Sequence, residues 1–529
     1  MRLARKCLIL SHRYLGIALG AVFMMWFASG LVMIYAGGMP QLDPDVRLER
    51  LAPLDTAAIR LSPAEAAQRA GLADVERASL TTVLNRPAYR FGRATIVFAD
   101  TGDLLQPIDQ SQAQAVAARF LDRPATDVAF VDTVRTPDQW TLTMSRSLPL
   151  LKFETADATQ VYVAPRTADV VLATTRQDRL LAWVGVIPHF LYFAPLRLNQ
   201  PLWYSVVVWL AEIGVVMAVL GLAVGIVRFR RTRPFSLMHS FPYAGWMRWH
   251  AVLGVVFGVF TLTWVFSGLV SMEPWAWTNA RGLDLEREVL SGGVMELDRY
   301  PKAEPAAWAA MAGDRAIKEV EFTTIQDEPY YVVRLAHQAR AVRRERLHQP
   351  YLIAGRAEGD RLLVSPATMR ARTEAFSNAS IVTRLQGAVP EARISEQTLL
   401  TEYDSYYYSR RGLTPLPVLR VKFDDPMRTW VYVDPGMSQI LAQVHRLNRV
   451  ERWLYNGLHS LDFAFWYRSR LWDVGIIALC LGGLVASTIG TVMGFGRVAR
   501  GVRAAVQVLP GTVARSNGTD GKAAPASAP

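Results

Sequence analysis

The chain has 529 residues, 51% of them hydrophobic, and a formal net charge of +12. This composition is too apolar for an ordinary soluble protein and too polar for a pure membrane bundle, so it predicts membrane helices joined to sizeable water-facing domains. The basic residues gather beside apolar segments, and no basic patch with interleaved aromatics occurs, which argues against nucleic-acid binding.

Four segments are apolar over the length that a helix needs to cross a bilayer, about 20 residues for about 30 Å of hydrocarbon. The first lies at about 14–36, within the N-terminal segment 1–36, and the others are 203–227, 250–272 and 472–495. The apolar core of the first is too long for a signal peptide, and the sequence after it is a poor cleavage site. We therefore expect all four segments to remain in the protein as spanning helices.

Arginine and lysine beside these segments predict the orientation, because such residues stay on the cytoplasmic side. Basic residues without acids occur in the N-terminal MRLARK, in the loop 228–249 and directly after the last span. We expect a multi-pass protein of a bacterial inner membrane with cytoplasmic termini, and a disordered tail at 496–529. The segments 37–202 and 273–471 mix acids and bases and are expected in the periplasm.

Both long segments alternate short β-rich runs with Ala-rich helical pieces. The β-rich runs are RATIVFAD, TQVYVAP, YYVVRL, RLLVSP, LRVKFDD and TWVYVDP. This pattern predicts two α+β domains with antiparallel sheets. The two cysteines, Cys7 and Cys480, lie outside these segments, so the domains must be stable without disulfides.

The chain contains an internal repeat. HRYLGIALG from His12 returns as HAVLGVVFG from His250, and RQDRLLAWVGVIPHFLYF (176–193) returns as RLNRVERWLYNGLHSLDF (446–463). Each half then reads as helix, outer domain, His-bearing segment and helix, with both halves entering the membrane in the same direction. We predict an α-helical membrane protein, a four-helix bundle from a parallel duplication, with a pseudo-twofold axis along the membrane normal.

Four of the eight histidines occupy matched places in the two halves. His12 and His250 open the first and third spans at the cytoplasmic face, and His189 and His459 precede the second and fourth at the outer face. Two imidazoles that face each other across a bundle can ligate a b-type haem, and no covalent attachment motif is required. We predict two haems b, one on each pair.

Glycines support this prediction. Gly16 and Gly20 follow His12 by four and eight residues, and Gly254 and Gly258 follow His250 in the same way. They lie on one helical face, and a flat macrocycle can pack against a helix only on a face from which no side chains project. The alternatives are a histidine at the membrane interface with no ligand role, glycines that serve helix packing, or copies without a present role.

Other charged groups have weaker assignments. Arg13, Arg248, Arg179 and Arg449 could neutralise haem propionates. The remaining histidines have no partner in the other half and are expected in loops: His239, His337, His348 and His445.

These features resemble the PepSY-associated transmembrane helix family, bacterial "iron-regulated membrane proteins" that include ferric-siderophore reductases. The resemblance rests on the HRxLGxxxG-type helix, its copy from His250, the segments IPHFLYF and GLHSLDF, and outer modules such as TWVYVDPGMSQIL; it covers roughly residues 5–500. It implies two PepSY-like domains outside the membrane and two b-type haems on four helices. It implies His12 and His250 on the inner haem, and His189 and His459 on the outer one.

The resemblance also implies a function, the reduction of a ferric siderophore or another periplasmic acceptor. The sequence has no P-loop and no flavin or nicotinamide fingerprint, so electrons are expected from a quinol or a cytoplasmic reductant. The stretch TEYDSYYYSRRG (401–412) offers aromatic and basic groups to an anionic or aryl chelate. The alternative for this stretch is a strand or edge loop that packs within the outer domain.

Two rival functions remain open. In the first, PepSY-like modules bind peptides or regulate a protease, and the helices only anchor them. In the second, the protein is a permease for iron or haem, which needs a polar pathway through the membrane. The helices offer few charges for such a pathway, and Glu212 is the clearest.

Overall fold

The computed structural model describes residues 2–36, 38–276, 278, 282–283, 285–286, 288–292, 295–336, 361–408, 414–467 and 471–508. The chain divides into two compact units. The helical unit comprises Met1–Ala28, Glu212–Leu262 and Ala478–Pro529, and the mixed unit comprises Ser29–Ala211 and Thr263–Ile477. Several residues considered above lie outside the described residues, namely His337, His348, Arg410, Arg411 and the tail 509–529.

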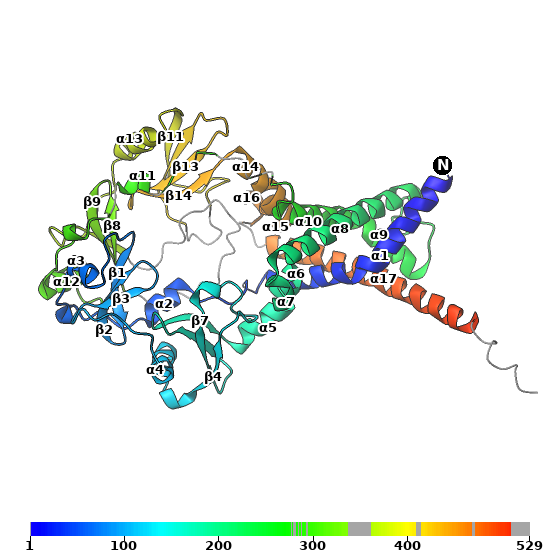
Figure 1. Cartoon of the computed structure of the whole chain (residues 1–529). Helices are drawn as coiled ribbons and strands as arrows, with labels where there is room; N and C mark the ends of the chain where they lie inside the picture. The colour runs from blue at the N-terminus through cyan, green and yellow to red at the C-terminus, as the bar shows by residue number, and fades with distance from the viewer. Residues whose placement is uncertain are drawn as a thin grey trace, which may run out of the picture. The chain divides into compact units, whose positions relative to one another are not determined.

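Three helices of the described part are long and apolar enough to cross a membrane. They are α1 (Arg2–Met33), α8 (Gln200–Arg228) and α17 (Leu471–Val508) (Figure 1). These helices coincide with three of the four predicted spans and support a membrane location. The prediction of a disordered tail from residue 496 is wrong for residues 496–508, which continue α17. This stretch contains no proline, so nothing in it interrupts the backbone ladder.

The fourth predicted span, 250–272, is not one straight helix. It consists of α9 (Gly245–Val256) and α10 (Gly258–Ser271), which are bent by 59° at the break and together qualify as one span. Thr261 Oγ1 donates a hydrogen bond of 3.0 Å to the Phe257 carbonyl oxygen, and such back-bonding by threonine bends helices. The Phe257 ring lies where a side chain at Gly482 of α17 would be, so packing also holds the break in place.

Glycines bring the helices of the helical unit close together, because they allow backbones to approach. α1 packs on α17, and α8 packs on α9 and α10. The residues that make the first contact correspond, by the repeat offsets of 238 and 269 positions, to the residues that make the second. Each of these contacts joins one half to the other, and the repeat relates the α1–α17 contacts to the contacts of α8 with α9 and α10. The contacts are Gly20–Thr491, Gly494–Ile17, Gly258–Leu222 and Gly225–Val255.

The mixed unit contains a six-stranded antiparallel sheet of order β10-β9-β8-β1-β2-β3 (Figure 1). Its strands are β1 (Ala78–Val83), β2 (Arg86–Phe91), β3 (Thr95–Phe98), β8 (Ile317–Ile325), β9 (Glu328–Leu335) and β10 (Arg361–Val364). β1 pairs with β8, with Ser79 opposite Glu321. The segments 37–202 and 273–471, predicted as separate domains, thus share one sheet, and this pairing covers strand edges that two separate sheets would expose.

Two four-stranded antiparallel sheets complete the mixed unit, with orders β4-β5-β6-β7 and β11-β12-β13-β14. The first contains β4 (Val128–Val134), β5 (Leu150–Thr155), β6 (Gln160–Ala164) and β7 (Asp169–Thr174). The second contains β11 (Ile394–Leu400), β12 (Val418–Phe423), β13 (Trp430–Asp434) and β14 (Gln439–Val444). Each predicted β-rich run contains a strand, which confirms an α+β arrangement.

Helices cover these sheets through small and apolar side chains. α3 (Pro63–Arg69) and α12 (Pro305–Ala312) pack on the six-stranded sheet, α4 (Gln110–Leu121) on the first small sheet and α13 (Asn378–Ala388) on the second. The remaining helices are α2 (Pro44–Arg50), α5 (Arg176–Val184), α6 (Val186–Phe190), α7 (Ala194–Arg197), α11 (Glu288–Ser291), α14 (Arg446–Arg452), α15 (Leu458–Ser460) and α16 (Ala464–Tyr467). α6 and α15 carry His189 and His459.

Candidate functional site

His12 and His250 lie next to each other in the helical unit. Their ring centroids are 6.3 Å apart, and the ring planes are inclined by 29°. Each ring is held by the later long helix of its own half. His12 Nδ1 is 3.2 Å from the Met217 carbonyl oxygen on α8, and His250 Nδ1 is 3.1 Å from the Ala486 carbonyl oxygen on α17.

These hydrogen bonds select a tautomer. A carbonyl oxygen can only accept, so Nδ1 must carry the proton in both rings. In the neutral imidazole Nε2 then keeps its lone pair, which is the state in which histidine ligates a metal. The backbone of α8 and α17 therefore prepares both rings as ligands through Nε2.

Glycine makes this approach of ring to backbone possible. A Cβ at Gly221 of α8 would lie 2.7 Å from His12 Cε1, and a Cβ at Gly490 of α17 would lie 2.9 Å from His250 Cε1. Both distances are far below ordinary van der Waals contact, so a larger residue would displace the ring. Gly221 and Gly490 are 269 residues apart, and sequence reasoning missed them although both belong to matched G-x-x-x-G pairs.

The four glycines predicted to face a macrocycle fall into two classes. Gly16 and Gly254 have no atom within 4 Å of the position that a Cβ would occupy. Gly20 and Gly258 instead contact Thr491 and Leu222 of neighbouring helices. The first class leaves open space one helical turn from each histidine, and the second class is used for helix packing.

His189 and His459 form the second pair, in the mixed unit. Their ring centroids are 6.2 Å apart, with planes inclined by 82°. His189 Nδ1 is 3.2 Å from Ser29 Oγ, and His459 Nδ1 is 3.0 Å from Ser267 Oγ. His459 Nδ1 is also 3.1 Å from the Trp264 carbonyl oxygen, so the tautomer argument holds for this ring too.

Repeated local structure positions the second pair. Gly30 and Gly268 follow the two serines, and a Cβ at these positions would meet His189 Cε1 at 3.5 Å and His459 Cε1 at 3.7 Å. Two residues after each histidine, a leucine adopts a left-handed conformation, with φ of 53° at Leu191 and 49° at Leu461. This conformation is unusual for a residue with a side chain, and it ends the short helix in both halves.

Both separations fit a single metal between two rings. An imidazole nitrogen lies about 2.0–2.1 Å from a bound metal and the ring centroid about 1.1 Å farther, so two rings on opposite sides of one iron would have centroids about 6.3 Å apart. The pairs measure 6.3 and 6.2 Å. Among the described residues no cluster of three or more His, Cys, Asp or Glu could hold a metal ion. A porphyrin brings four nitrogen ligands of its own, so two histidines suffice for its iron.

Three of the four arginines considered for haem propionates have other partners. Arg179 donates to the carbonyl oxygens of Thr174 and Ala158. Arg449 donates to those of Arg428 and Val444. Arg248 donates to the Tyr243 carbonyl oxygen at 2.6 Å. Sequence reasoning missed a different arginine, Arg452, which is 3% exposed.

The tyrosines of the stretch 401–412 pack within the mixed unit. Tyr407 is fully buried and stacks on Tyr432 at 5.1 Å. Tyr408 is buried and donates a short hydrogen bond to Asp462. Tyr406 meets Trp430 edge-on at 5.3 Å. The packing alternative is thus confirmed for Tyr407 and Tyr408, and Arg410 and Arg411 lie outside the described residues.

The unmatched histidines that the structure describes have local roles. His239 lies in a turn, where its Nδ1 is 2.8 Å from Ser236 Oγ. His445 caps α14 by accepting a hydrogen bond from the Asn448 backbone nitrogen. Burial lowers the pKa of His445, which favours the neutral ring that this cap needs.

The family model of the PepSY-associated TM region matches residues 10–493. This range starts two residues before His12 and ends within α17, so it contains both histidine pairs. No curated protein matches the chain.

Proposed function

Since the chain belongs to the family of the PepSY-associated TM region, we propose that it is a di-haem b protein that carries electrons across a bacterial inner membrane. In this proposal α1, α8, the bent pair α9–α10 and α17 are four spans related by a parallel duplication. The termini are cytoplasmic, and the mixed unit faces the periplasm. The acceptor is a ferric siderophore, whose reduction releases Fe(II) for iron acquisition.

The observation that carries the proposal is the pair of ring separations. Two unrelated surface histidines have no reason to keep a spacing of about 6.3 Å, and here the spacing occurs twice, between residues that the repeat relates. The open positions at Gly16 and Gly254 beside the first pair add to it. A histidine pair that served only as an interfacial polar group would not need such space.

The chain's own residues have defined roles in this proposal. A bound b-type haem supplies a one-electron Fe(III)/Fe(II) couple. His12, His250, His189 and His459 would hold the iron through Nε2. The carbonyl oxygens at Nδ1 of His12, His250 and His459 hold these rings and increase their basicity, and Ser29 holds His189. The apolar helix faces exclude water, which together with the ligands sets the reduction potential. The donor, a quinol or a cytoplasmic reductant, gives one electron for each ferric ion reduced.

A second candidate, peptide binding without redox chemistry, has one observation in its favour. β11 is the edge strand of its sheet, and a groove of about 830 Å³ lies between it and α13, lined by Gln386, Ile394 and Gln397 among others. An exposed edge strand beside a groove can accept an extended peptide as an additional strand. In that case the helices act as an anchor and the histidine pairs are inherited copies.

A visible spectrum of the detergent-purified protein separates the two functions. We expect Soret and α bands of a b-type haem that sharpen on reduction with dithionite, and about two haems per chain by the pyridine haemochrome assay. The reduced protein should be reoxidised by a ferric siderophore, and Fe(II) should appear in a ferrozine assay. A colourless preparation from haem-replete cells would refute the redox proposal and favour the peptide-binding one.

A further inference from the structure

The segment around His459 contains a buried polar cluster that the matching segment around His189 lacks. The cluster comprises Glu451, Arg452, Asn456 and Asp462, which are 8%, 3%, 5% and 5% exposed. The first half has Leu181, Ala182, Val186 and Tyr192 at these places. Burial of charged groups is unfavourable unless they are paired. Within the cluster Arg452 and Asp462 form a buried ion pair, with Nη2 3.9 Å from Oδ2. The second half therefore carries a charged cluster where the first half packs apolar residues.

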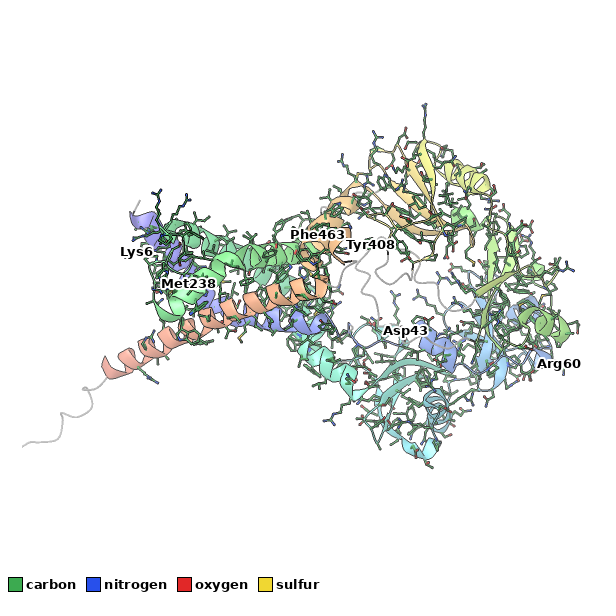
Figure 2. All side chains as sticks on the ribbon, turned by 180° about the vertical axis from the view of Figure 1, so that it is seen from behind. Lys6, Asp43, Arg60, Met238, Tyr408 and Phe463 are labelled. Atoms are coloured by element: carbon green, nitrogen blue, oxygen red, sulfur yellow. The ribbon has the colours of Figure 1, made fainter. Side chains whose placement is uncertain are left out.

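Arg452 is held firmly in this cluster. Its Nε donates to the Ser405 carbonyl oxygen at 2.8 Å, and its Nη2 donates to the Asp462 carbonyl oxygen at 2.7 Å. The guanidinium lies 4.9 Å from the ring centroid of Tyr408 and 4.4 Å from that of Trp453. Figure 2 labels Tyr408 and Phe463, the residue after Asp462, which mark this part of the mixed unit. Such contacts fix the guanidinium plane.

One nitrogen of Arg452 is not used. Nη1 is buried and has no hydrogen-bond partner among the residues that the structure describes. A buried donor without a partner is unfavourable, and most of all when it belongs to a charged group. A rigid guanidinium with a free N–H pair is suited to a carboxylate, which it binds by charge-assisted hydrogen bonds.

Arg452 and His459 belong to one helical run. α14 ends at Arg452, the π-helix Trp453–Gly457 follows, and α15 begins with Leu458. The two residues lie seven positions apart in this run, with the π-helix between them. Tyr455 of the π-helix stacks on His459 with centroids 5.2 Å apart. π-Turns of this kind occur frequently at functional sites.

We propose that Arg452 binds a carboxylate of the group held between His189 and His459, which for haem is a propionate. This inference rests on the proposed function. Ala182 occupies the matching place in the first half, so that position offers no cation to the second pair. Arg452 is thus a positioning residue that sets which edge of the macrocycle faces segment 446–463.

The test compares haem with its dimethyl ester, in which the propionates carry no charge. The full chain in detergent, freed of haem, is titrated with each compound, and binding is followed by the spectrum of six-coordinate iron. We expect the wild type to bind haem at least about tenfold more tightly than the ester at one of two sites, because the ester cannot form charge-assisted hydrogen bonds with the guanidinium. His189→Ala should abolish binding at that site and so identify it.

Arg452→Met should reduce the preference for haem over its ester to about one at that site and leave the other site unchanged. Arg452→Gln, which keeps hydrogen-bonding ability, serves as the second variant should the methionine variant fail to fold. Arg449→Met is the matched control on the same helix, because Arg449 is bound to backbone carbonyls, and it should retain the wild-type preference.

Two results would overturn the inference. One is a wild type that binds two haems without distinguishing haem from the ester, and the other is an Arg452→Met or Arg452→Gln protein that keeps the wild-type preference. A wild type that binds no haem refutes the proposed function itself, so the two failures are distinguishable.

Discussion

At the scale of single residues, the two histidine pairs differ in the angle between their rings, 29° in one and 82° in the other. Nearly parallel and nearly perpendicular imidazole planes split the iron d orbitals differently. We therefore expect two low-spin ferric EPR signals of different anisotropy. His12→Ala should remove one signal and His459→Ala the other, each with a loss of about one haem in the haemochrome assay. A variant that keeps both haems would show that the replaced histidine is not a ligand.

The glycines after His12 offer a second test, because two neighbours on one helix have different surroundings. Gly16→Leu should lower the haem content and leave the thermal stability of the haem-free protein nearly unchanged, since nothing lies within 4 Å of its Cβ position. Gly20→Leu should destabilise the protein by about 1–3 kcal/mol, because a Cβ there would be 2.5 Å from Thr491 Oγ1. Full haem content in the Gly16 variant would place that residue away from the cofactor.

The sequence could indicate which histidines are equivalent, but the groups that hold them depend on how the helices are rotated against one another. Gly221 and Gly490 show this limit. Their spacing in the repeat is visible in the sequence, yet a glycine in an apolar helix has the same appearance whether it faces lipid, a helix or an imidazole. The contact with His12 Cε1 and its counterpart at His250 required coordinates.

At the scale of elements, hydropathy sufficed for α1, α8 and α17 and failed at the break between α9 and α10. The stretch from His250 to Met272 is apolar throughout, so its composition predicts one span. The bend depends on the Thr261–Phe257 hydrogen bond and on Gly482, which is more than 200 residues away in the sequence. The local sequence includes Thr261 and Phe257, but it does not include Gly482, which contacts the break only in the folded protein.

The break provides a prediction for α17. Gly482→Ala should destabilise the helical unit by about 1–3 kcal/mol, because the new Cβ would overlap the Phe257 ring. Gly501→Ala on the same helix is the control. No atom lies within 4 Å of its Cβ position, so it should leave stability unchanged or raise it by up to about 1 kcal/mol. Thermal unfolding of both variants in the same detergent measures the difference, and equal melting temperatures would contradict the packing role of Gly482.

At the scale of the whole molecule, the feature that the sequence did not predict is the sheet shared by the two outer segments. The short β-rich runs predicted the individual strands correctly. The pairing of β1 with β8 joins residues more than 230 positions apart, and no local pattern encodes which edge strands meet. The repeat itself provides the physical reason, since two equivalent meanders expose equivalent edges that can pair antiparallel.

This pairing can be tested by cross-linking a chain divided in the loop between α8 and α9. Ser79→Cys in one fragment and Glu321→Cys in the other place thiols at directly opposite positions, where Cα atoms about 4.5–5.5 Å apart permit a disulfide. With Cys7 and Cys480 replaced by serine, the two fragments should migrate together on a non-reducing gel. Phe322→Cys in place of Glu321→Cys shifts the register by one residue, turns the thiol to the opposite face and should abolish the cross-link.

A periplasmic mixed unit further requires that the disulfide form in cells without added oxidant, because the periplasm is oxidising and the cytoplasm is not. Cross-linking by both pairs would contradict the register, and cross-linking only after added oxidant would contradict the orientation proposed for the chain.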